Sequence, residues 1–152
     1  MVNLTSLRGP GDITFETQTA QLTCTDALAK GDIVMLTLAS GGYTACTKSA
    51  TADSTPDHIL GVALEDVGAG GRGEIGLKGV FNCACEDDMD AGIPGSQSAS
   101  TAGRLKSITT NPAADSGAFV KMVAISLAAT ATAGDLTSCL FDGITGFSSA
   151  AV

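Results

Sequence analysis

The stretch RGEIGLKGV, residues 72–80, is the segment that decides the fold class. Ile75, Leu77 and Gly79 fall on one face of an extended chain, while Glu74 and Lys78 fall on the other. This two-residue alternation is typical of a half-buried β-strand. The segment therefore predicts a strand in a sheet that packs one face on a core.

Other short runs of β-branched and apolar residues have strand length and lie between turn residues. The further expected strands are Gln21–Thr25, Asp32–Leu38, Tyr43–Thr47, His58–Leu64, Leu105–Thr109, Phe119–Leu127 and Leu136–Phe141. A helix is conceivable only over Met122–Ala131, which is rich in Ala, but Val, Ile and Thr in that stretch favour a strand. The sequence thus predicts an all-β, mainly β-stranded protein.

Composition indicates one folded domain with a thin core. The chain has 152 residues, of which 73 are Ala, Gly, Thr or Ser, and it contains no Trp, one Tyr and five Phe. Aromatic side chains normally contribute much of the buried area, so contacts between subunits are expected to supply part of the stability.

The formal net charge of -8 argues against nucleic acid as a partner, because phosphate binding requires Lys and Arg. The sequence contains no run of about 18 apolar residues, so it predicts no membrane-spanning helix. The first eleven residues lack the apolar core of a signal peptide. We expect a soluble, unsecreted protein with no membrane partner.

The chain is expected to divide into an N-terminal arm, residues 1–18, and one β-rich domain, residues 19–152. Gly9, Pro10 and Gly11 disfavour regular structure in the arm. The domain carries a weak internal duplication, with related units near 25–82 and 95–146 joined through Cys83–Pro94. The run ILGVAL, residues 59–64, corresponds to VKMVAI, residues 120–125, and Gly31 to Gly95.

Four features of the sequence are candidate sites of chemistry. The segment 68–73 matches G-x-G-x-x-G, but a strand pattern follows it where a dinucleotide site needs a helix, so a hairpin loop is expected. Cys83 and Cys85 have no second pair or nearby His to complete a metal site, and buried, reduced thiols are expected for them and for Cys24, Cys46 and Cys139.

The other two features are acidic and basic side chains. The run 86–90, EDDMD, lacks the spacing of a calcium loop and is expected to be a solvated connection, with weak cation binding as the alternative. His58 has no recognisable catalytic partner. The sequence therefore predicts no enzyme activity, no cofactor and no resident metal, although paired carboxylates brought together by the fold remain an alternative.

Three segments occur in an order that resembles the head decoration, or cement, proteins of bacteriophages. They are AKGDIV at 29–34, ILGVAL at 59–64 and GEIGLKGVF at 73–81, with a similar theme repeated from Gly95 to Ile144. The second copy departs from the pattern, since it reads KMVA at 121–124. The resemblance implies a small β-barrel or β-tulip-like domain that trimerises and clamps neighbouring subunits of an expanded capsid.

On this resemblance the expected partners are the major capsid protein and two further copies of the chain, and the expected location is the outer capsid surface. The arm offers Leu4, Leu7, Ile13 and Phe15 as apolar points that could order on the capsid. Two alternatives remain: another β-type virion component, such as a tail tube, fibre or adhesin domain, and a small hydrolase or carbohydrate-binding domain.

Overall fold

The computed structural model describes residues 17–39, 42–49, 59–86, 88–98, 100–108, 119–130, 132–141 and 146–149, and these contain strands and turns but no helix. The all-β prediction is confirmed. The strands are β1 Gln18–Cys24, β2 Ile33–Ala39, β3 Gly42–Lys48, β4 Ile59–Ala63, β5 Arg72–Ala84, β6 Pro94–Gln97, β7 Leu105–Ser107, β8 Phe119–Met122, β9 Ala124–Ser126, β10 Leu136–Phe141 and β11 Gly146–Ser149.

The first five strands form a closed barrel, which confirms the small β-barrel that the resemblance to decoration proteins implies. Their order is β1-β3-β2-β4-β5, and β1 closes the ring by pairing antiparallel with β5. The β1–β3 contact is parallel and the remaining neighbours are antiparallel. Closure removes free strand edges, and the interior fills with small and medium side chains, which suits this composition. They are Cys24, Leu28, Val34, Cys46, Ala63, Val67 and Ile75, with Leu22 and Leu77 packed against them.

Strands β2 and β4 lie between two cores. Val34 and Ala63 face the barrel interior, whereas their neighbours Ile33 and Val62 belong to a second core with Phe81, and all four are buried. A strand that is covered on both faces has a continuous run of apolar residues in place of alternating apolar and polar ones. This explains the uninterrupted run at residues 59–64.

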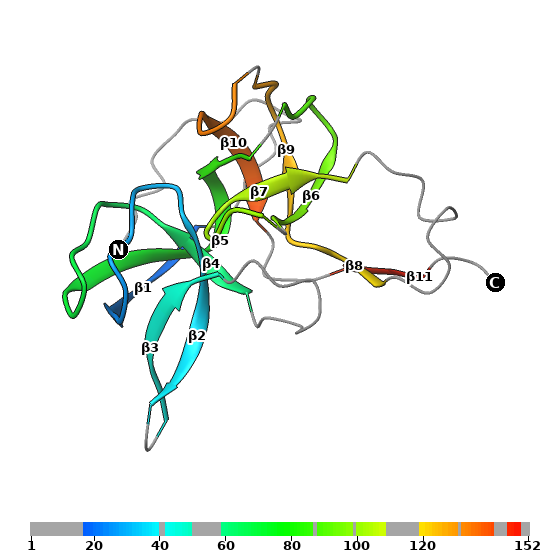
Figure 1. The fold of residues 1–152 in the computed structure, drawn as a ribbon. Coiled ribbons are helices and arrows are strands. Elements are labelled where there is room, and N and C mark those ends of the chain that lie inside the picture. The colour runs from blue at the N-terminus through cyan, green and yellow to red at the C-terminus, as the bar shows by residue number, and fades with distance from the viewer. Residues whose placement is uncertain are drawn as a thin grey trace, which may run out of the picture.

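Strand β5 is the long element that serves both halves of the molecule (Figure 1). Its first part pairs with β1 and β4, and its second part, from Gly79 to Ala84, pairs with β10. The change occurs at Gly79, which has φ of +133°, next to an irregularity in the β1 register. A positive φ is costly for other residues, so Gly79 allows the strand to bend from one unit to the other.

The second half repeats the strand order of the first. In the sheet, β7-β6-β9-β10 stand in the same order as β3-β2-β4-β5, with the same antiparallel pairings. Cys85 makes a parallel bridge to Leu105 in β7, as Cys24 does to Cys46 in β3. Strand β7 of the second half therefore lies beside the C-terminal end of β5.

The turns of the two halves also correspond. Leu28 bridges Val67 before β2 and β5, and Met89 bridges Thr130 before β6 and β10. Both pairs exchange two backbone hydrogen bonds. In this alignment Gly31 corresponds to Gly92, and both have positive φ, whereas the sequence comparison matched Gly31 with Gly95, a buried residue within β6.

Several element boundaries differ from those expected. Strand β5 continues to Ala84, so Cys83 lies in the sheet and not in a connection, and β6 and β11 were not anticipated. Pro94 and Gly95 carry no strand signal, but tertiary pairing with β9 and β7 fixes them as a strand. The stretch 119–127 forms two strands, with β8 pairing with β11 in a separate ribbon.

Candidate binding surface

The glycine-rich segment 68–73 is a loop followed by a strand, as expected. Gly71 donates its amide hydrogen to the carbonyl of Gly68, Gly70 has φ of +79°, and β5 begins at Arg72. No helix N-terminus is present here to receive a phosphate. The segment closes the β4–β5 connection and carries no site.

All five cysteines are buried and unpaired by disulfides in the structure. Cys83 and Cys139 lie in the second core, where the hydrogen bond between them and burial raise the pKa of the Cys83 thiol. Within the described part of the chain, no group of three or more His, Cys, Asp or Glu side chains is arranged to hold a metal ion.

The acidic run is partly structural. Met89 is fully buried in the second core, while Asp88 and Asp90 are exposed. Glu86 accepts hydrogen bonds from the hydroxyls of Ser98 and Ser100, which attaches the loop to the segment after β6. The run was expected to be a wholly solvated connection, and a buried methionine within it was not foreseen.

The remaining expected site residues lie outside the described residues. They are His58 and the arm residues Leu4, Leu7, Ile13 and Phe15. Thr17, the first described residue, contacts β5, and its Cα lies 3.2 Å from the position that a Cβ on Gly79 would occupy. The chain therefore enters the barrel beside the bend in β5.

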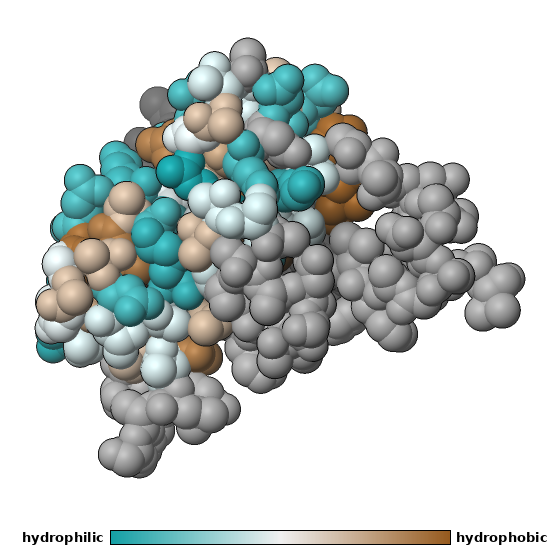
Figure 2. Space-filling view, viewed as in Figure 1, coloured by the Kyte–Doolittle hydropathy of each residue, from teal (hydrophilic) through white to brown (hydrophobic). Residues whose placement is uncertain are grey.

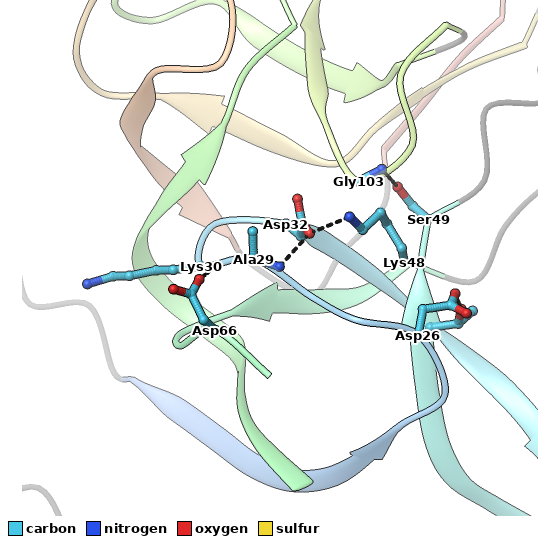
Figure 3. Close-up of polar contacts among 9 residues, drawn as sticks. Asp26, Ala29, Lys30, Asp32, Lys48, Ser49, Asp66 and Gly103 are labelled. Carbon is cyan, nitrogen blue, oxygen red and sulfur yellow. Dashed lines mark hydrogen bonds and ion pairs between the residues drawn. The ribbon is translucent and has the colours of Figure 1, made fainter. Parts of the chain in front are cut away.

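A buried polar joint connects the two halves of the molecule (Figure 3). The Asp32 carboxylate accepts the amide hydrogen of Ala29 at 2.8 Å and pairs with the Lys48 ammonium at 2.9 Å. Gly103, in the β6–β7 connection, lies directly over this pair. Its amide donates to Ser49 and its carbonyl accepts from Ile33. The sequence predicts Asp32 only as the start of a strand and as part of the segment 29–34, and no local pattern indicates its contacts with Lys48 and Gly103.

An apolar row crosses the outer face of the second half. Val80 on β5 is paired with Leu140 on β10, Leu140 with Ile125 on β9, and Ile125 with Pro94 on β6. Ile108 extends the row, since its amide donates to the carbonyl of Pro94. Directly paired residues share a face of a sheet, so these side chains lie together, and all are exposed or half-buried.

The three exposed large hydrophobic side chains among the described residues lie on this same face. Val80 is 37% exposed, and Leu127 and Leu136 are each 43% exposed. Leu127 lies next to Ser138 on β10, and Leu136 is paired with Ala84 on β5. We call these three residues and the row the outer apolar face. On the side seen in Figure 2, hydrophobic residues occur in small groups among hydrophilic ones.

The pKa shifts that are resolved belong to buried thiols and not to residues of this face. An exposed apolar sheet face with few charges is suited to contact with another protein surface. Among the residues that the structure describes, no helix has the length and apolar character needed to cross a membrane.

The fold is similar to that of a solved phage protein. The N base of the head fiber protein gp8.5 of bacteriophage phi29 superposes with a TM-score of 0.58 and 10% sequence identity, over 86% of this chain and 98% of that one. At this identity the likeness concerns the fold alone. No protein-family model and no curated protein sequence matches the chain.

Proposed function

We propose that the protein is a structural component of a phage virion that binds the outside of the expanded capsid as a homotrimer and cements neighbouring major capsid subunits. The fold likeness, which spans nearly the whole base of a phage head fiber protein, supports the coarser part of the proposal, that the protein is a structural component of a virion. The order of the segments at 29–34, 59–64 and 73–81 supports the same class of protein independently of that likeness.

The outer apolar face supplies a contact surface for this role. Val80, Leu127 and Leu136 expose apolar area that the folded chain does not bury by itself. Thr17, the first described residue, lies beside Gly79, the residue before Val80. On this proposal the arm that precedes Thr17 and the outer apolar face engage the same shell. Binding only to the assembled lattice stabilises that state by mass action, and many weak contacts then act together.

The second candidate is the base of a head fibre or another projecting β-type component. The specific observation in its favour is the identity of the structural neighbour, which is the base of a head fibre. In that role the protein would attach a projecting fibre to the head without clamping neighbouring capsid subunits.

Copy number on purified particles tests the proposal. We expect near-stoichiometric copies on expanded heads, and stripped heads that burst at lower temperature or force than decorated ones. Decorated and stripped heads that burst at the same temperature or force would replace the cement role with the fibre role. Absence of the protein from heads would refute both of these locations.

A further inference from the structure

Two buried cysteines face each other where the barrel closes. Cys24 ends β1, Cys46 lies in β3, and the two residues are direct partners in the parallel β1–β3 pairing. Both are fully buried, and their Sγ atoms are 3.8 Å apart, with the Cys46 thiol donating to the Cys24 sulfur. The two thiols therefore point at each other inside the barrel.

This arrangement has the geometry that a disulfide requires. Neighbouring strands run about 4.8 Å apart, and disulfides connect Cα atoms about 4.4 to 6.8 Å apart. Rotation of the side chains is sufficient to bring the sulfurs together. Cys83 and Cys139 are different, because they are diagonal across β5 and β10, where Cys83 is paired with Thr137 and Cys139 with Phe81. Diagonal residues lie about 7 to 8 Å apart, so a bond between them requires backbone movement.

The β1–β3 pairing is the shorter of the two pairings by which β1 closes the barrel. Its backbone pairing covers only Thr23 and Cys24 of β1, whereas β1 pairs with β5 from Gln18 to Thr23. Strand β1 also carries the arm at its N-terminal end. A covalent bond at Cys24 would therefore fix the element through which force on the arm reaches the barrel.

We propose that Cys24 and Cys46 form a disulfide under oxidising conditions and so close the β1–β3 side of the barrel covalently. The proposal concerns the barrel itself and does not depend on the proposed function. The second half provides an internal contrast, since the corresponding bridge joins Cys85 to Leu105, where no disulfide is possible.

The reaction with a disulfide oxidant such as oxidised glutathione is balanced. One cysteine thiolate attacks the oxidant and forms a mixed disulfide, releasing one glutathione thiolate. The second cysteine thiolate then attacks the sulfur of the first cysteine in this mixed disulfide. The protein disulfide forms, and the second glutathione thiolate is released. Two protein thiols are oxidised, one glutathione disulfide is reduced to two thiols, and the two protons pass from the cysteines to the glutathione products.

Burial controls the rate of this reaction. Burial, with the hydrogen bond to Cys24, raises the pKa of Cys46 to about 12, so its thiolate is scarce at neutral pH. The oxidant also reaches the pair only when β1 separates from β3. The bond should therefore form slowly in the folded protein and readily during refolding in a glutathione redox buffer.

The test is peptide mapping after refolding in oxidised and reduced glutathione, with free thiols alkylated in denaturant. We expect one linked peptide pair, containing Cys24 and Cys46, with Cys83, Cys85 and Cys139 alkylated. The bond closes a loop of moderate length, so the oxidised protein should show a Tm about 6 to 12 °C higher than the reduced protein. Cys24→Ala and Cys46→Ala should each abolish the shift, while Cys139→Ala, at another buried cysteine, should keep it.

Two results would overturn the proposal: complete alkylation of Cys24 and Cys46 after oxidation, or a linked peptide that joins Cys83 to Cys139 instead. The wild-type map gives this answer by itself, so the test remains decisive if an alanine variant fails to fold.

Discussion

The ammonium group of Lys48 lies 2.9 Å from the carboxylate of Asp32, a side chain that is almost fully buried between the two halves of the molecule. The same carboxylate receives the amide of Ala29 and lies under Gly103. A buried charge is tolerated only when it is paired and hydrogen-bonded. The contact therefore makes the position of the β6–β7 connection dependent on the pairing of β2 with β3.

Loss of the Asp32 carboxylate should destabilise the protein. Breaking a buried pair costs about 3 to 5 kcal/mol, and partial exposure of Lys48 reduces this to about 2 to 3 kcal/mol for Asp32→Ala. Urea unfolding measures the change in the free energy of unfolding. The exposed Asp90→Asn in the loop before β6 is the control and should stay within about 0.5 kcal/mol. Equal effects of the two substitutions would show that the joint contributes nothing.

Gly103→Ala should cost more than Gly70→Ala, although both glycines have φ near +78°. At Gly70 an added Cβ meets nothing within 4 Å, so only backbone strain of about 1 to 2 kcal/mol is expected. At Gly103 the Cβ would lie 2.7 Å from Cγ of Lys48 and 3.0 Å from Oδ1 of Asp32. An additional loss of about 1 kcal/mol follows from overpacking. Denaturant titration of both variants compares the two costs, and the same value at both sites would contradict the contact.

Alkaline pH should destabilise the reduced protein. Burial raises the pKa of Cys46 from 9.0 to about 12, so above pH 9 the unfolded chain loses a proton that the folded chain retains. The unfolded state then binds fewer protons, and the free energy of unfolding falls between pH 9 and 12 by up to about 1.4 kcal/mol per pH unit. Cys46→Ala should make this slope smaller in urea titrations under reductant. An unchanged slope would show that Cys46 does not titrate in this way.

Charges placed on the outer apolar face should weaken attachment to heads while leaving the fold intact. Val80→Asp with Leu127→Asp alters two exposed side chains, so stability should change by no more than about 1 kcal/mol. Head binding should fall at least about tenfold, because desolvated apolar residues dominate protein interfaces. Gln21→Asp with Thr23→Asp adds the same charge at exposed positions on β1 and should bind normally. Equal binding by both double variants would exclude the outer apolar face from the contact.

Deletion of residues 2–16 should abolish head binding and leave the folded oligomer, as judged by sedimentation and by thermal unfolding. Replacement of the apolar arm residues by Ser should have the same effect at full length; these are Leu4, Leu7, Ile13 and Phe15. A truncated protein that binds heads as the full chain does would assign the arm no role in attachment.

The strands could be predicted where local pattern and tertiary environment agree. Residues 72–80 alternate because this part of β5 has neighbours on both sides and packs on the barrel core, and residues 59–64 are continuously apolar because β4 lies between two cores. Strands β6 and β11 could not be predicted in this way. Pro94 and Gly95 favour turns by themselves and become a strand only through pairing with β7 and β9.

The features of the candidate site also divide into those that a local pattern predicts and those that depend on contacts between distant residues. The absence of a helix after the glycine-rich segment could be predicted, because the strand pattern that follows it is local. The pairing of Asp32 with Lys48, the facing thiols of Cys24 and Cys46, and the row from Val80 to Ile108 join residues far apart in the chain. No spacing in a single sequence encodes these contacts.

Local sequence pattern is sufficient to predict short strands and turns, since alternation, β-branching and glycine act over a few neighbouring residues. Contacts between distant segments establish which strands pair, where β5 bends at Gly79, and which apolar residues stay exposed. Those outcomes depend on hydrogen bonds and packing between distant segments. These interactions stabilise the protein only after the barrel has closed and the second half has folded against it.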